Sequence, residues 1–321
     1  MYKKYLSSIC FLLSSIALQA QDDTHVFGFL QLPASSHAAA LGGENISVIE
    51  DDINLATHNP ALLASASDKT LALNYMHYIE GVNVAGAAFA RIAGERTTWA
   101  VTARYVDYGE LTQTTEENIE LGEFSAKDIA LSGIYTYNLS DYWSGGVSAN
   151  LLYSRYHQSS SIAVGVDLGV NYYREEQDLS FSLVVRNLGG QLKAFEERRE
   201  SLPVNLQAGL TKRLAHAPVR LSVTLHDLTH WSSATTRANH FGRKLLNHVA
   251  LGIDFIPTRT FYLAAGYNFR RGDEMKINGS SHWAGFTCGT GIQLKRLKLG
   301  LAYAKYHVSA SSLVCNLAYR L

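Results

Sequence analysis

Apolar residues and small or polar residues alternate with a period of two along most of the chain from about residue 69 onward. In residues 162–172 one set of alternate positions reads Ile, Val, Val, Leu, Val and Tyr, and the other reads Ala, Gly, Asp, Gly and Asn. Residues 249–255 and 261–270 show the same alternation. Because alternate side chains of a β-strand lie on one face, this period predicts strands with one apolar face each.

The composition of the second face distinguishes a soluble β-sandwich from a membrane barrel. In a sandwich that face meets water and is rich in Lys, Glu and Thr, whereas here it is mostly Gly, Ala, Ser and Asn. The alternating segments also run to about 10–13 residues, which is long enough to cross a bilayer as tilted strands. The pattern therefore predicts an all-β protein: an antiparallel transmembrane barrel with an apolar outer surface and a lumen of small and polar side chains.

We expect fourteen strands, an even number that is typical of bacterial single-chain barrels. Their predicted ranges are 69–78, 83–94, 97–107, 126–138, 142–154, 160–174, 177–188, 202–213, 217–228, 245–256, 259–270, 283–294, 296–306 and 310–321. The long connections, 108–125, 189–201, 229–244 and 271–282, all follow odd-numbered strands. Since such barrels have short periplasmic turns and longer outer loops, we expect an integral outer-membrane protein with both termini in the periplasm.

The composition agrees with a lipid-facing surface. Only 17% of the 321 residues are charged, against about 25% in a soluble domain. The 28 basic and 28 acidic residues balance, which argues against a nucleic-acid partner. Three cysteines are too few for a disulfide scaffold, and we expect Cys288 and Cys315, separated by another predicted strand, to be free thiols.

The first 68 residues divide into two parts. Residues 1–20 have two lysines and then an apolar stretch that ends in a small residue, which indicates a signal peptide cleaved between Ala20 and Gln21. The alternative, a membrane anchor, needs a longer apolar run. Residues 21–68 do not alternate, yet their apolar content requires burial. We expect this N-terminal segment to form a small plug in the lumen of a barrel that spans 69–321.

Two motifs within the plug segment shape its backbone. Leu41-Gly42-Gly43 permits a tight turn after an alanine-rich stretch. Asn59-Pro60-Ala61 suits the start of a helix, because proline fixes its own φ and disfavours a helical conformation at the preceding residue. Neither motif offers reactive chemistry.

The stretch FLQLPASSHAAALGG at 29–43, followed by DDINLATHNPALL at 51–63, resembles the opening of the PorQ family of the type IX secretion system. The resemblance extends over the whole mature length. Asn-Pro-Ala is shared with a wider group of fatty-acid-transporter-like barrels of fourteen strands, whereas the Leu-Pro and Leu-Gly-Gly stretch favours PorQ. The resemblance implies a PorZ-like surface partner, possible PorU-like and PorV-like components, and contact with outer-membrane lipid or lipopolysaccharide.

Other chemistry is weakly indicated. His226, His230, His240 and His248 lie near one another in sequence, but no cysteine or carboxylate spacing completes a metal site. No Gly-x-Ser-x-Gly nucleophile motif is present. We therefore expect no metal, no cofactor and no enzymatic activity. Asp167 and Asp254 are predicted to face the lumen, where an ion pathway is the alternative to simple solvation or bonding to the plug.

The long connections carry the residues that we expect to meet a partner. Phe195, Trp231 and Phe241 are candidate contacts, since exposed aromatic side chains in loops are costly unless covered. The alternative is that they pack on one another or at the membrane interface. The acidic stretch from Glu110 to Glu123 lacks a calcium-binding pattern and is expected to be a solvated loop.

The sequence therefore favours a barrel that anchors a PorZ-like surface protein. The first alternative is a channel for hydrophobic small molecules, as in other barrels of the wider group, and the second is a membrane hydrolase. A continuous apolar tunnel would favour transport, and a polar, occluded lumen would favour the anchor.

Overall fold

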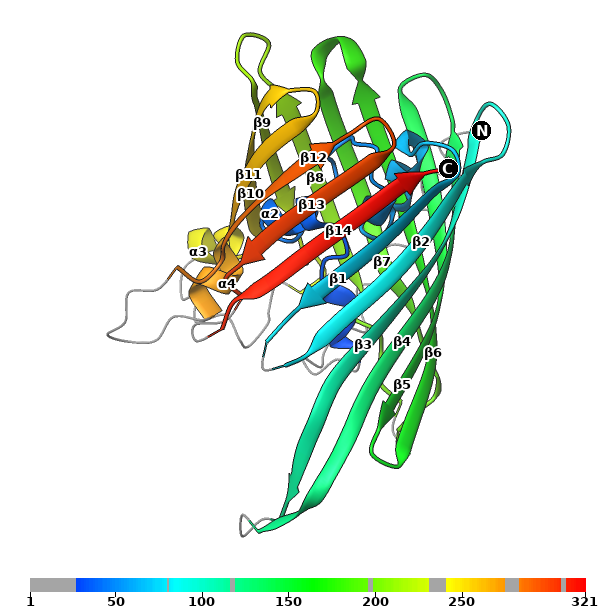
Figure 1. The fold of residues 1–321 in the computed structure, drawn as a ribbon, viewed down its shortest axis with the longest axis vertical. Helices are drawn as coiled ribbons and strands as arrows, with labels where there is room; N and C mark the ends of the chain where they lie inside the picture. Colours follow the sequence, from blue (N-terminus) through cyan, green and yellow to red (C-terminus); the bar gives the residue numbers. More distant parts are fainter. Residues whose placement is uncertain are drawn as a thin grey trace.

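The computed structural model describes residues 27–79, 81–115, 119–195, 199–230, 241–274, 283–306 and 310–321. Within these residues fourteen antiparallel strands close into a barrel, in which each strand pairs with its neighbours in sequence and β1 pairs with β14 (Figure 1). The strands are β1 Thr70–His77, β2 Asn83–Ile92, β3 Thr97–Thr114, β4 Glu120–Asn138, β5 Trp143–Tyr156, β6 Ser159–Arg174, β7 Leu179–Lys193, β8 Asn205–Arg213, β9 Val219–Leu225, β10 Val249–Thr258, β11 Phe261–Asn268, β12 Phe286–Gln293, β13 Leu297–Ala304 and β14 Ser312–Arg320. The predicted fold class is confirmed.

The two faces of each strand differ as the alternation predicts. On β6, Val164 and Leu168 are exposed on the outside, whereas Asp167 and Asn171 are buried toward the lumen. Exposed Leu, Val, Ile and Tyr side chains follow the outer faces of the other strands in the same way. No helix in the described part of the chain is long and apolar enough to span a bilayer. The outer band of apolar side chains is instead the surface that a bilayer would cover.

The predicted connection 108–125 is wrong. β3 continues to Thr114 and β4 begins at Glu120, so most of this stretch is a long hairpin that extends beyond the neighbouring strands (Figure 1). Its register shifts between Asp107 and Glu110. That irregularity interrupts the alternation, which is why the pattern ended too early.

Three other predicted connections also contain regular structure. β7 runs on to Lys193, and short helices occupy parts of the remaining two, α3 at Phe241–Leu246 and α4 at Phe269–Glu274. The turns after even-numbered strands are short, as expected; residues 259–260 join β10 to β11. These turns lie at the same end of the barrel as the C-terminus (Figure 1).

The described N-terminal residues lie inside the barrel, where they form the expected plug (Figure 1). The plug contains the 3₁₀ turns η1 Gly28–Gln31, η2 Ile53–Thr57 and η3 Pro60–Ser65 and the short helix α2 Ser36–Ala40. Side chains cap three of them: Ser35 accepts a hydrogen bond from the amide of Ala38, Asp52 from Asn54 and Asn59 from Ala61. The predicted helix start at Asn59-Pro60 is therefore confirmed.

Candidate functional site: the plugged lumen

The Leu-Gly-Gly motif lies against the barrel wall. Gly42 and Gly43 adopt positive φ angles of 91° and 85°, which glycine tolerates without steric cost. The amide of Gly42 donates to the Thr287 hydroxyl at 3.0 Å, and that hydroxyl donates to the carbonyl of Ala40 at 2.7 Å. A Cβ at Gly266 of β11 would overlap with the Gly42 backbone. The motif and the wall are therefore complementary at the level of the main chain.

The Asn-Pro-Ala motif packs against the barrel wall in a similar way, at β4 and β5. The side-chain nitrogen Nδ2 of Asn59 donates to the carbonyl of Ile46 at 3.0 Å, and the Thr136 hydroxyl donates to the carbonyl of Pro60 at 2.6 Å. A Cβ at Gly146 of β5 would overlap with the backbone of Pro60 and Ala61. The small side chains that the sequence predicted on the inner faces of the strands thus leave room for the plug.

A buried ion cluster joins the plug to the wall. His37 of α2 contacts Glu50 through Nδ1, and its Nε2 lies 2.7 Å from Oδ1 of Asp254 on β10. The other carboxylate oxygen of Asp254 accepts from Nε of Arg220 on β9 at 2.7 Å, and Lys298 of β13 pairs with Glu50. The prediction that Asp254 faces the lumen is confirmed, and its partners are protein groups.

The electrostatics of the plug side of this cluster follow from its contacts. Burial alone would lower the pKa of His37, but the carboxylates of Glu50 and Asp254 outweigh it and raise the pKa to about 9. Burial would raise the pKa of Glu50, whereas the charges of His37 and Lys298 hold it well below its usual value. His37 is therefore protonated at neutral pH and donates from both ring nitrogens. Its ring also stacks on Tyr262, with centroids 3.8 Å apart.

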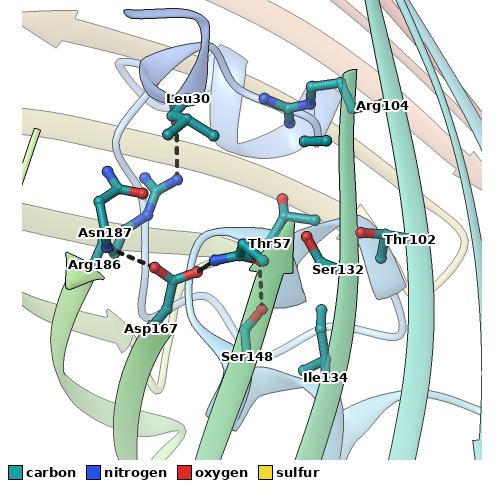
Figure 2. Close-up of a pocket in the computed structure, with 12 residues that line it drawn as sticks. Leu30, Thr57, Thr102, Arg104, Ser132, Ile134, Ser148, Asp167, Arg186 and Asn187 are labelled. Atoms are coloured by element: carbon teal, nitrogen blue, oxygen red, sulfur yellow. Dashed lines mark hydrogen bonds between the residues drawn. The ribbon is translucent and has the colours of Figure 1, made fainter. Parts of the chain in front are cut away.

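A second polar region lies between the plug and strands β3 to β7 (Figure 2). Asp167 faces this region, as predicted. Its carboxylate accepts from the side-chain nitrogen Nδ2 of Asn150 at 2.8 Å and from the backbone amide of Asn187 at 2.7 Å. The cavity here has a volume of about 50 Å³. That space holds a few water molecules or a small ion, and it is smaller than the about 300–1,000 Å³ typical of a site for a drug-sized ligand.

Three of the four histidines singled out in the sequence, His226, His230 and His248, lie among the described residues. His226 and His248 are neighbours, with ring centroids 6.5 Å apart, and His230 lies against Asp227 at 2.5 Å. His240 lies outside the described residues. No group of three or more metal-ligating side chains occurs among the residues that the structure places. Cys288 and Cys315 are free thiols.

The candidate partner residues have separate surroundings. Phe195 packs edge-on against Tyr156, with ring centroids 5.3 Å apart. Phe241 is 76% exposed at the start of α3. Trp231, like the predicted cleavage site at Ala20 and Gln21, lies outside the described residues. The sequence did not single out Trp283, which is 73% exposed, or the β3–β4 hairpin.

These features define a membrane-type β-barrel whose lumen is filled by its own N-terminal segment. Solved structures with a similar fold are described as the Pseudomonas putida toluene transporter TodX (TM-score 0.55, 12% identity, 92% of this chain and 99% of that chain), a Pseudomonas aeruginosa FadL homologue (0.54, 11%, 89% and 98%) and the monoaromatic hydrocarbon channel CymD (0.54, 12%, 92% and 98%). At this identity the likeness shows the fold, that of FadL- and TodX-like outer-membrane barrels. No protein-family model and no curated protein matches the sequence.

Proposed function

We propose that this chain is a closed outer-membrane anchor for a surface protein, with the β3–β4 hairpin as its docking element. In this arrangement the apolar outer band holds the barrel in the bilayer, and the short turns and both termini face the periplasm. The long hairpin then projects from the outer surface. The single observation that carries the proposal is the hairpin itself.

The hairpin is longer than membrane crossing requires. β3 has 18 residues and β4 has 19, whereas a tilted strand spans a bilayer with about 9–11. β2 pairs with β3 only as far as Asp107, and β5 pairs with β4 only from Ala126 onward. Residues 110–115 and 119–124 therefore form a two-stranded ribbon whose outer edges have no neighbouring strand among the described residues.

A two-stranded ribbon is only marginally stable by itself, and the unpaired backbone groups at its edges can hydrogen-bond to a further strand. Leu111 is 36% exposed, and Ile119 and Leu121 are each 61% exposed. By sequence, residues 110–123 contain five glutamates and no basic residue. These properties suit a partner that adds a strand and presents basic side chains. The family resemblance of the plug motifs supports a PorZ-like surface protein in this role.

The filled lumen also supports an anchor. The plug fits wall positions where only glycine leaves room, and it is held by a buried ion cluster. A plug held in this way supports a filled lumen over an open apolar tunnel.

The test is surface retention of the PorZ-like protein in cells whose only copy of the barrel has residues 110–123 replaced by an Asn-Gly turn. We expect this variant to fold and to release the partner into the medium. Arg174→Gln, which changes an exposed side chain at the short-turn end of β6, is the control and should retain the partner. Retention by the shortened hairpin at the wild-type level would contradict the proposal.

A second candidate function is passage of small hydrophobic compounds. It is favoured by the comparisons, because TodX and CymD are described as a transporter and a channel for such compounds and share the fold. In that case the plug must move to open a path. Uptake of a monoaromatic hydrocarbon into cells or vesicles that contain the barrel, beyond the rate in matched empty membranes, would support this candidate over the anchor.

A further inference from the structure

Two arginines of the wall extend toward the first turn of the plug from different strands, Arg104 from β3 and Arg186 from β7 (Figure 2). Nη1 of Arg104 donates to the carbonyl of Leu32 at 2.9 Å, and Nη2 of Arg186 donates to the carbonyl of Leu30 at 3.0 Å. These bonds satisfy backbone acceptors at the end of η1, but they give neither arginine an ion pair.

Three other partly or fully buried arginines of the described chain are each paired with a carboxylate. Arg220 pairs with Asp254, Arg270 with Asp227 and Glu274, and Arg271 with Glu44 at 3.7 Å. In the described part of the chain neither Arg104 nor Arg186 has a carboxylate within ion-pair distance. Asp167 lines the same cavity, but its two oxygens accept from Asn150 and Asn187. With Asp167 as the single carboxylate among the described residues that line this cavity, the two enclosed like charges are unfavourable unless a further counter-charge is supplied.

The groups around the cavity are suited to an anion. Nε of Arg186 is buried without an acceptor. Thr102 and Ser132 add hydroxyl groups to the lining, whereas the hydroxyl of Ser148 donates to Asn150 at 2.9 Å. His58 of the plug cannot offset the two charges, because burial and then the fields of Arg186 and Arg104 hold its pKa well below the usual value and keep it neutral. Guanidinium groups bind tetrahedral oxyanions through paired N–H donors.

We propose that this cavity binds a small inorganic oxyanion of the size of sulfate or phosphate, held by Arg104 and Arg186. The cavity volume of about 50 Å³ suits such an ion and excludes an acyl chain. The bound anion neutralises the two arginines and thereby stabilises the first turn of the plug, which both arginines contact. This site is independent of the docking hairpin and of whether the barrel anchors a partner.

The test is calorimetric titration of the purified full-length barrel in detergent with sodium sulfate and with sodium phosphate, against sodium chloride at matched ionic strength. We expect saturable binding of at least one oxyanion and a rise in unfolding temperature beyond that in chloride. Arg186→Gln and Arg104→Gln should each weaken binding about tenfold or more, because each removes charge-assisted bonds. Arg155→Gln, at an exposed arginine on β5, is the matched control and should bind as the wild type does.

A further variant keeps the proposal testable if an arginine substitution prevents folding. Ser132→Asp places a carboxylate in the cavity, so it should abolish oxyanion binding and raise the unfolding temperature in the absence of added anion. Failure of wild-type protein to bind either oxyanion saturably, or equal binding by Ser132→Asp, would overturn the proposal. Neither result depends on partner retention.

Discussion

Two regions of the lumen contain buried cationic side chains, and they differ in what these side chains contact. Around His37 the plug and three strands bring three cationic groups against two carboxylates, so every cationic group there has a carboxylate partner within the chain. Around Arg104 and Arg186 the wall offers two cations to backbone carbonyls alone. One side of the plug is therefore held by ion pairs within the chain, whereas in our proposal the other side is completed by a bound oxyanion.

Breaking the ion pairs around His37 should have the largest effect. Asp254→Asn preserves the shape of the side chain but leaves Arg220 and His37 without their shared carboxylate. Removing one member of a buried ion pair costs about 3–5 kcal/mol. We expect a loss of this size in the free energy of unfolding, measured with guanidinium in detergent. A loss below about 1 kcal/mol would mean that the cluster is not coupled to the plug.

Alkaline pH should weaken the same side more gently. The pKa of His37 is about 9 in the folded chain against 6.5 for the ordinary side chain, so its favourable contribution is fully present below pH 6.5 and is lost as the pH rises through 9. The difference corresponds to about 3 kcal/mol. Unfolding titrations at pH 6, 8 and 10 should show this fall in the wild type and a flatter profile in His37→Gln. Parallel profiles would refute the assignment.

The seat of the plug can be tested without changing any charge. Gly146→Ala introduces a Cβ that overlaps with the Pro60 backbone, and overpacking of this kind costs about 1–3 kcal/mol. Gly133→Ala on the neighbouring strand is a matched control, because a Cβ there meets nothing within 4 Å. The prediction is a lower unfolding temperature for the first variant only. Equal behaviour of the two would show that the plug shifts freely.

The smallest effect is expected around Arg104 and Arg186. Arg186→Gln loses the hydrogen bond to the carbonyl of Leu30, because glutamine is shorter, but it also removes a charge that has no ion pair, so the net loss should be about 1 kcal/mol or less. Measured beside Asp254→Asn in chloride buffer, it should be clearly the milder change. A loss as large as that of Asp254→Asn would erase the contrast between the two regions.

Much of the barrel could be predicted because alternation is a local property of sequence. The faces of β6 and the lumenal positions of Asp167 and Asp254 follow directly from it. The same holds for the start of η3, since Asn59 and Pro60 are adjacent and act locally. The hairpin was missed where the register shift at Asp107 breaks the alternation.

The contacts of the lumen could not be predicted in the same way. His37 and Asp254 are 217 residues apart, and no local sequence pattern around either residue indicates that they pair. The match between Gly146 and Pro60 likewise exists only after the barrel closes. The contact between Phe195 and Tyr156 also joins residues that are far apart in the sequence.

Amide hydrogen exchange of residues 36–48 tests most directly whether the plug is fixed, which is the central claim of a closed anchor. The purified barrel should be compared in detergent with and without a monoaromatic hydrocarbon. If the plug is fixed, we expect slow exchange in this segment, unchanged by the hydrocarbon. The reason is that the backbone of the segment is buried and is hydrogen-bonded to the wall at Ser36 and Gly42. Fast exchange, or exchange that accelerates when the hydrocarbon is added, would contradict this expectation and indicate a plug that opens for transport.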